Sequence, residues 1–140
     1  MRIFLDANVL FSASQPESAF ARLIVAAGRN ARVLTSEIAG AEARRNLALK
    51  RPVWLESFEA LLAELELVPA AVFSLPVSLD EKDMPLLCAA IRARSDYFVT
   101  GDRRDFGHLF GTRVLGTLVI TPLQLAEILS GRVEPEPDEL

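Results

Sequence analysis

Two short hydrophobic runs, each followed by an aspartate, constrain the fold of this chain more than any other feature. Residues 3–5 (IFL) and 97–100 (YFVT) are rich in β-forming residues and too short for helices, so we expect two buried strands. Asp6 follows the first run directly, and Asp102 follows the second after one glycine. Ligands of open α/β sheets bind at the carboxyl ends of strands, so both carboxylates are placed where a ligand would bind.

The rest of the chain alternates between helical and strand-like periodicity. Strands that alternate with helices predict an α/β fold, a three-layer sandwich in which helices flank a parallel β-sheet. Two helix starts rest on capping boxes, at Ser14 with Glu17 and at Thr121 with Gln124, and a third on a cap at Thr35 or Ser36. The predicted helices cover residues 14–28, 36–50, 52–66, 83–94 and 122–130, and the strands cover 3–5, 32–35, 97–100 and 114–120, with a possible short strand within 67–75.

Length and composition predict a single domain. The chain has 140 residues, of which 51% are hydrophobic, and no repeat or linker divides it before residue 132. We therefore expect one domain over residues 1–131, followed by an acidic, disordered tail over 132–140. No apolar run reaches the roughly 18 residues of a membrane span, and no signal-peptide pattern precedes the first strand. With Cys88 as the single cysteine, an internal disulfide is excluded, and the pattern is typical of a cytoplasmic protein.

The distribution of charge matters more than the net charge of −4. Four of the 19 acidic residues lie in the last seven positions, so the rest of the chain is neutral, with 15 acidic and 15 basic residues. If four of those acids bound one metal ion, the remaining surface would be basic, as a phosphodiester substrate requires. The basic residues nearest in sequence to the candidate acids, and therefore the predicted RNA-binding set, are Arg44, Arg45, Arg103 and Arg104.

Glu42 lies within the predicted helix over residues 36–50. Its spacing from Ile38 and Leu49 places all three on one apolar face, where a carboxylate needs a partner to offset its desolvation. The alternative is an ordinary salt bridge to Arg45, three residues later.

Asp83 lies four and eight residues before Leu87 and Ile91, on the inward face of the next helix. Considered alone, it is better explained as a helix N-cap. Asp105 and Asn8 also have ordinary explanations, a solvated turn and the cap of a short helix, although Asn8 could instead orient Asp6 or a metal-bound water.

Considered together, the four acids are stronger evidence for a shared site than any one of them alone. They come from four separate segments, and a shared position would create strong repulsion unless a cation is bound or one acid is protonated. His108 is the single histidine and is expected to be peripheral. An all-oxygen site selects Mg²⁺ or Mn²⁺, which can lower the pKa of a bound water and neutralise charge on a phosphoryl group. The predicted chemistry is hydrolysis of phosphodiesters.

The motifs also resemble a known family. Residues 5–10 (LDANVL), Glu42, residues 83–90 (DMPLLCAA) and residues 99–106 (VTGDRRDF) are similar to the PIN-domain family, in the family's order and over about residues 1–130. The resemblance implies a parallel sheet between helices and a metal-dependent ribonuclease. It assigns Asp6, Glu42, Asp83 and Asp102 as catalytic metal ligands, with Asn8, Thr100 and Asp105 as supporting residues.

Many small members of this family are VapC-like toxins of toxin–antitoxin pairs. The resemblance therefore implies an RNA substrate, an antitoxin partner that fills the site, and a homodimer. Single-stranded or looped RNA is the expected target, because its backbone is flexible enough to enter a small acidic centre.

Two other interpretations remain. A non-catalytic module that binds nucleic acid or protein could use the same scaffold. A haloacid-dehalogenase-type phosphotransferase also begins with a strand and an aspartate, but it would have a second aspartate where this chain has Asn8. Metal-dependent cleavage of RNA distinguishes the nuclease from both.

Overall fold

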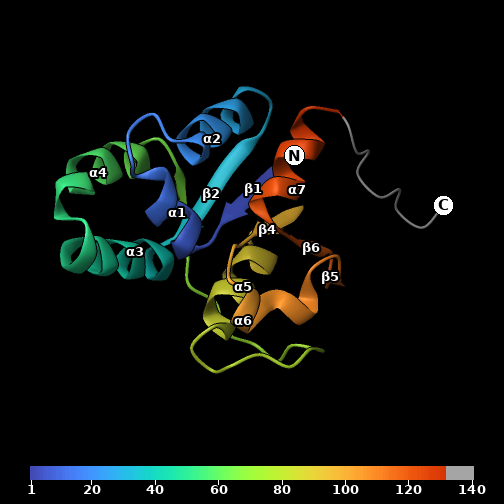
Figure 1. Ribbon diagram of the computed structural model, residues 1–140. Helices are drawn as coiled ribbons and strands as arrows, with labels where there is room; N and C mark the ends of the chain where they lie inside the picture. Colours follow the sequence, from blue (N-terminus) through green and yellow to red (C-terminus); the bar gives the residue numbers. More distant parts are fainter. Residues whose placement is uncertain (132–140) are drawn as a thin grey trace.

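A central sheet of six strands forms the middle of the fold in this computed structural model (Figure 1). In chain order the strands are β1 (Arg2–Leu5), β2 (Arg32–Ser36), β3 (Glu66–Val68), β4 (Tyr97–Val99), β5 (Arg113–Val114) and β6 (Thr117–Ile120). Their order in space is β3-β2-β1-β4-β6-β5, and all neighbours are parallel except β5 and β6. The structure describes residues 1–131, and the predicted acidic tail (132–140) lies outside the described residues.

Helices cover both faces of this sheet. Every residue of β4 and β6 is buried, as are three consecutive residues of β1, and consecutive burial requires cover on both faces. The predicted three-layer α/β fold is therefore confirmed. The helices are α1 (Ala7–Ala13), α2 (Ala19–Asn30), α3 (Glu37–Lys50), α4 (Leu55–Ala63), α5 (Met84–Arg92), α6 (Arg103–Phe106) and α7 (Pro122–Leu129), with 3₁₀ turns at Pro52–Trp54 and Gly107–Leu109. Within residues 1–131, none of the helices is both long and apolar enough to cross a membrane.

The strand order creates a switch point between β1 and β4. The chain passes from β1 outward through β2 to β3 and then returns to pair β4 with the other side of β1, with Leu5 opposite Val99. Connections that leave in opposite directions open a crevice at the carboxyl ends of the two central strands. Asp6 and the loop that carries Asp102 begin at this crevice.

One predicted strand is a hairpin. Residues 114–120 were expected to form one strand around Gly116, but the chain reverses there and β5 pairs antiparallel with β6. Leu115 and Gly116 have φ values of 47° and 95°, the positive values that two-residue hairpin turns require. The prediction of a wholly parallel sheet was therefore wrong at this edge.

The first capping box was also wrong. Ser14 ends α1, and its hydroxyl donates to the Leu10 carbonyl oxygen at 2.7 Å. Glu17 adopts a left-handed conformation with φ 61°, so it cannot lie in a first helical turn. The cap of α2 is Ser18, whose side chain accepts from the Ala21 amide at 3.1 Å. The short helix considered after the first strand is present as α1, but its N-cap is Asp6, and Asn8 lies within its first turn.

Other boundaries agree more closely with the sequence. The Ser36 cap of α3 and the Thr121–Gln124 capping box of α7 are confirmed. The helix predicted over residues 52–66 ends at Ala63, and β3 starts three residues later. This short strand ends immediately before Pro69, as expected for a residue without an amide donor.

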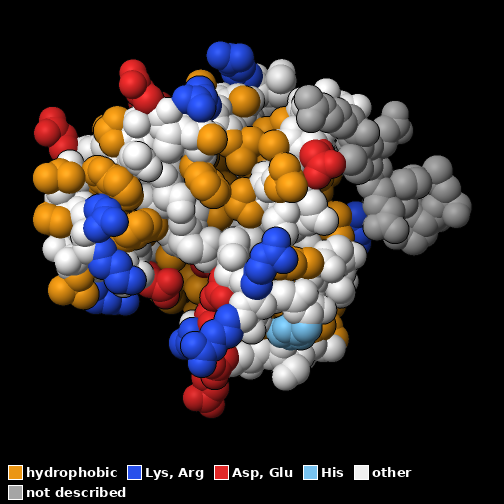
Figure 2. Space-filling view, in the orientation of Figure 1, with side chains coloured by type: hydrophobic (Ala, Val, Ile, Leu, Met, Phe, Trp, Pro, Cys, Tyr) orange, Lys and Arg blue, Asp and Glu red, His pale blue; other side chains and the backbone are white. Residues whose placement is uncertain are grey.

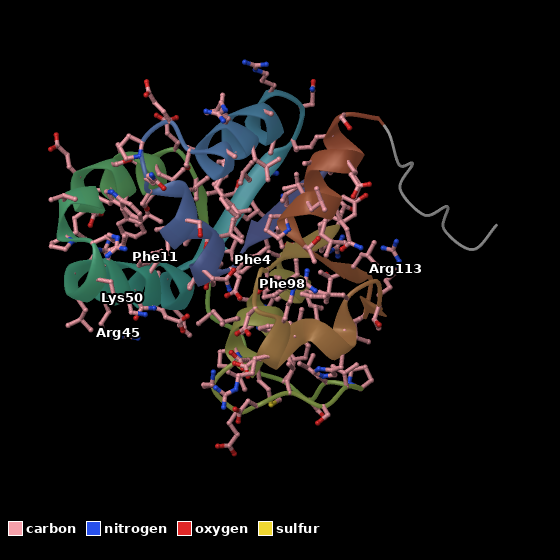
Figure 3. All side chains as sticks on the ribbon, in the orientation of Figure 1. Phe4, Phe11, Arg45, Lys50, Phe98 and Arg113 are labelled. Atoms are coloured by element: carbon pink, nitrogen blue, oxygen red, sulfur yellow. The ribbon has the colours of Figure 1, made fainter. Side chains whose placement is uncertain are left out.

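Three phenylalanines join the central strands to α6. The rings of Phe4 and Phe98 on neighbouring strands (Figure 3) stack with centroids 5.5 Å apart. The ring of Phe106 lies 5.0 Å from that of Phe98. All three side chains are fully buried. Cys88 is also fully buried, as expected for a small core residue. The aromatic contacts hold α6, and therefore the Asp102 loop, against the carboxyl ends of the strands.

We expect Phe98→Ala to lower the free energy of unfolding by about 3–5 kcal/mol, because it removes a buried ring between two others and leaves a cavity. Urea denaturation measures the loss. Val53→Ala is the control, since Val53 is 84% exposed and should change stability by no more than about 0.5 kcal/mol. Equal effects of the two substitutions would contradict this description of the core.

Candidate metal centre

Asp6 lies at the point where β1 becomes α1. It is the N-cap of α1, and its Oδ1 accepts from the Ala7 amide at 2.8 Å. Its Oδ2 accepts from Asn8 Nδ2 at 3.0 Å and from the Thr100 hydroxyl at 2.8 Å. The residue is 2% exposed. Three donors therefore hold this buried carboxylate in one orientation.

The loop after β4 is tied to the same network. Thr100 Oγ1 accepts from Asn8 Nδ2 and from the Asp102 amide, each at 3.1 Å. Asn8 Oδ1 in turn accepts from the Gly101 amide at 2.8 Å. A Cβ atom at Gly101 would lie 3.3 Å from Asn8 Oδ1, so glycine permits this close approach. Asn8 and Thr100 thus fix Asp6 relative to the Asp102 loop.

Asp102 is the N-cap of α6, where its Oδ1 accepts from the Asp105 amide at 3.0 Å. The turn that the sequence indicated here is a short helix. Asp102 is half-buried and lines a pocket of about 400 Å³ together with Glu42. The remaining lining residues are Asn8, Ser12, Phe20 and Gly101.

Glu42 reaches this pocket for a different reason from the one predicted. The buried face of α3 is formed by Ala39, Gly40, Ala43 and Leu47, whereas Ile38 and Leu49 are 39% and 78% exposed. The assignment of Glu42 to an apolar stripe was therefore wrong. Nor does Glu42 form an ion pair with Arg45 or any other residue of the described chain. Its half-exposed carboxylate belongs to the pocket wall.

Asp83 has a buried carboxylate on which the charge of Asp6 acts. It is the N-cap residue of α5, as its ordinary explanation predicted, but its side chain makes no capping hydrogen bond. The residue is 5% exposed, and its Oδ2 accepts no hydrogen bond from residues 1–131. Carboxylate oxygens of Asp80, Asp83 and Asp105 lie within 4.8 Å of one another. A buried oxygen without a donor, beside two further acids, fits a cation ligand.

The acids influence one another electrostatically. Burial raises the pKa of Asp6 to about 6, against the lowering effect of its hydrogen bonds from Thr100 and Ala7, and the charges of Glu42 and Asp102 raise it further. Burial also raises the pKa of Asp83, and the charges of Asp105 and Asp6 add to that effect. The charges of Glu42 and Asp102 thus act on Asp6, and the charge of Asp6 acts on Asp83. All their ligand atoms are oxygens, which suits Mg²⁺ or Mn²⁺.

The candidate RNA-binding arginines differ in their contacts. Arg44 makes two hydrogen bonds to Glu59, at 2.7 and 2.9 Å, and lies over the Phe58 ring. Arg45, Arg103 and Arg104 are exposed and form no ion pair with the described residues. Figure 2 shows acidic side chains in a recess with basic side chains on both sides of it.

Sequence reasoning missed several residues around the centre. Ser12 is one helical turn after Asn8, a spacing that could have indicated a shared face. Phe20, Asp80 and Lys82 gave no such signal, because tertiary contacts bring them to the site. His108, whose Nε2 lies 2.7 Å from the Ser78 carbonyl oxygen, makes no contact with the four acids and is peripheral as expected.

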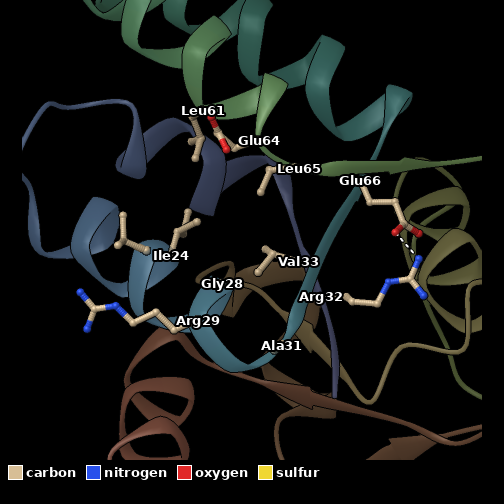
Figure 4. A pocket seen from close by; sticks show the side chains of 11 residues that line it. Ile24, Gly28, Arg29, Ala31, Arg32, Val33, Leu61, Glu64, Leu65 and Glu66 are labelled. Atoms are coloured by element: carbon tan, nitrogen blue, oxygen red, sulfur yellow. Dashed lines mark hydrogen bonds and ion pairs between the residues drawn. The ribbon is translucent and has the colours of Figure 1, made fainter.

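A larger pocket, of about 550 Å³, lies between α2, β2 and α4 (Figure 4). It is lined by apolar residues such as Ile24, Val33 and Leu61, and by two acidic residues, Glu64 and Glu66, of which Glu66 is paired with Arg32. None of the predicted site residues lines it. The acid-lined crevice at the switch point therefore remains the candidate site.

No protein-family model and no curated protein matches this sequence. Among solved structures, the chain is similar to VapBC2 from Rickettsia felis bound to a DNA fragment from their promoter, with TM-score 0.63 and 16% identity over 86% of this chain and 98% of that chain. It is similar to FitAB bound to the IR36 DNA fragment, with TM-score 0.56 and 21% identity over 86% and 94%. It is also similar to VapBC-1 from nontypeable Haemophilus influenzae, with TM-score 0.56 and 12% identity over 88% and 99%.

At these identities the likeness establishes the fold. The chain has the fold of the matched chains in these VapBC and FitAB structures, and the match extends over most of its length. The resemblance inferred from the sequence motifs is thus confirmed for the architecture.

We expect metal-free protein to lose stability as pH rises from about 4 to about 6. The folded protein binds the Asp6 proton more tightly than the unfolded chain, whose aspartate has the ordinary pKa of 3.8, so stability is greatest below that value. Asp6→Asn removes this titrating group, so the free energy of unfolding should change with pH by up to about 3 kcal/mol less than in the parent protein. Urea denaturation in EDTA at several pH values measures it.

Glu56→Gln is the matched control, because Glu56 is an exposed acid on α4 outside the pocket. It should leave the pH dependence of the free energy of unfolding unchanged. A curve for Asp6→Asn as steep as that of the parent protein would contradict the electrostatic description of the centre.

Proposed function

We propose that this protein is a metal-dependent ribonuclease that hydrolyses RNA phosphodiester bonds. The proposal rests on an acidic region at the switch point: Glu42 and Asp102 line one pocket, their charges act on the buried Asp6, and Asp83 has a buried oxygen that lacks a donor in the described chain. In this proposal Asp6, Glu42, Asp83 and Asp102 hold Mg²⁺ or Mn²⁺. Asn8, Thr100 and Asp105 support them.

The bound cation would supply a water of lowered pKa and neutralise negative charge on the phosphoryl group. The chain's own residues position that chemistry. Asn8 and the Thr100 hydroxyl fix the orientation of Asp6, and the Asp105 amide fixes that of Asp102. Residues locked by hydrogen bonds hold a reactive geometry without reorganisation. The crevice admits a flexible strand, which favours single-stranded or looped RNA.

We further propose that the protein is a toxin that an antitoxin silences. Support comes from the fold, since the similar structures are VapBC and FitAB complexes, two of them bound to DNA. A partner that filled the crevice would exclude both the cation and RNA. A homodimer belongs to the same proposal, because small PIN-like toxins are often dimeric.

Asp102→Asn should abolish RNA cleavage and leave RNA binding largely intact. An asparagine still caps α6, so the loop is retained while one anionic ligand is lost. The assay incubates purified protein with pooled RNAs and Mg²⁺ or Mn²⁺, and EDTA should stop the reaction. Glu56→Gln is the control and should cleave like the parent protein. If Asp102→Asn cleaved RNA like the parent protein, the activity would not come from this centre, and the nuclease assignment would be wrong. Absence of metal-dependent cleavage by the parent protein would leave the interaction module in its place.

Arg103→Ala and Arg45→Ala should weaken RNA binding without weakening metal binding. Both side chains are exposed and have no acidic partner in the described chain, so they are available to phosphates. Each lost phosphate contact should reduce the salt dependence, the slope of log K against log salt, by about 0.7 for single-stranded RNA. Fluorescence anisotropy at several salt concentrations measures the slope.

Arg44→Ala provides a matched comparison, because Arg44 lies on the same helix but is paired with Glu59. We expect it to change the salt dependence of RNA binding less than Arg45→Ala does. The reverse order would show that phosphate displaces Glu59 from Arg44.

A further inference from the structure

The acidic centre has a second part, which contains acidic residues beyond the four proposed ligands. Asp80 and Asp83 come from the loop before α5, and Asp105 comes from α6. Their carboxylate oxygens lie within 4.8 Å of one another, although 22 residues separate Asp83 from Asp105 in the sequence. Three negative charges this close require a cation or a proton.

In this structure Lys82 provides a positive charge at that position. Its Nζ donates to Asp105 Oδ2 at 2.6 Å and lies 3.6 Å from Asp83 Oδ2. The second distance is too long for a hydrogen bond, so the buried Asp83 oxygen gains charge compensation but no donor. Lys82 therefore satisfies Asp105 and leaves the coordination of Asp83 incomplete.

The two ends of the ion pair differ in exposure. The Asp83 and Asp105 side chains are 7% and 16% exposed, whereas that of Lys82 is 67% exposed. A long side chain that reaches in from solvent forms a weak pair, because water and lost side-chain entropy offset the attraction. Its ammonium group can return to solvent when a stronger cation arrives, while the acids remain in place.

We propose that Lys82 is a tethered counter-cation of Asp83 and Asp105, and that a divalent metal ion displaces it. The inference rests on the proposed metal centre. An ammonium group carries one charge, whereas Mg²⁺ or Mn²⁺ carries two and binds carboxylate oxygens directly. The ammonium and the metal ion compete for the same oxygens. The Lys82 ion pair therefore lowers the affinity for metal, and metal binding in turn releases the ammonium group, because both effects reflect one coupling free energy.

The sequence offers an internal control for this release, because Lys50 and Lys82 are the only lysines. Lys50 is exposed at the end of α3 and forms no ion pair with the described residues. Brief acetylation with an amine-reactive ester, followed by peptide mass spectrometry, gives the ratio of Lys82 to Lys50 labelling. We expect saturating Mn²⁺ to raise this ratio several-fold over EDTA at equal ionic strength. An unchanged or lower ratio would overturn the proposal.

Calorimetric titration with Mn²⁺ tests the competition independently. Lys82→Gln should tighten Mn²⁺ binding by roughly two- to fivefold, the upper part of the range expected for the loss of an exposed ion pair. Lys50→Gln removes the same charge elsewhere and should change binding by less than about twofold. Lys82→Arg keeps a cation there and should bind Mn²⁺ no more tightly than the parent protein. Equal effects of Lys82→Gln and Lys50→Gln would overturn the proposal.

Neither measurement uses RNA, so its result is separable from the proposed function. Mn²⁺ binding with release of Lys82, but without RNA cleavage, would support the counter-cation and reject the nuclease. RNA cleavage and Mn²⁺ binding without release of Lys82 would support the nuclease and reject the counter-cation. Absence of Mn²⁺ binding to the parent protein would overturn both.

Discussion

The buried carboxylate of Asp6 is the constraint on which the site and its surroundings depend. A charge that is 2% exposed is unfavourable unless donors surround it, and here the Ala7 amide, Asn8 and Thr100 supply them. Each donor comes from the crevice at the switch point. The close pairing of β1 with β4 and the small residue at position 101 are thus conditions for satisfying one side chain.

These hydrogen bonds do not remove the unfavourable free energy of burying a carboxylate beside other acids. They lower the pKa of Asp6, yet burial and the neighbouring acids keep it near 6, so the folded protein holds charge that it would be more stable without. Stacked phenylalanines directly beneath the crevice offset that unfavourable free energy through apolar burial. A site that is unfavourable when empty has free energy to gain from a cation, which is the physical basis for strong metal binding.

The sequence predicted the parts of the site that depend on strand ends. Asp6 and Asp102 could be placed because parallel strands present their carboxyl ends at one edge. Glu42 was placed near them on an incorrect helical phase, since α3 is rich in alanine and its buried face is formed by small residues rather than by Ile38 and Leu49. Periodicity indicates a buried face only when large apolar residues mark it.

Other features were beyond local patterns. The hairpin at Leu115 and Gly116 depends on two positive φ values, and a leucine rarely signals one. The cap of α2 is Ser18 and not the predicted Ser14, because α1 extends to Ala13 and Ser14 ends it. In both cases neighbouring structure overrode a local signal.

The two parts of the acidic centre offset the repulsion between carboxylates in different ways. Around Asp6 the chain uses fixed donors at the start of α1 and directly after β4, which cannot leave when a ligand arrives. Around Asp83 it uses the long side chain of Lys82, which is mostly exposed. Fixed donors orient a carboxylate, whereas an exchangeable ammonium group lowers repulsion and leaves the oxygens available. A centre that combines both can fold without metal and still bind it, because the residues that orient the ligands are not those that neutralise them.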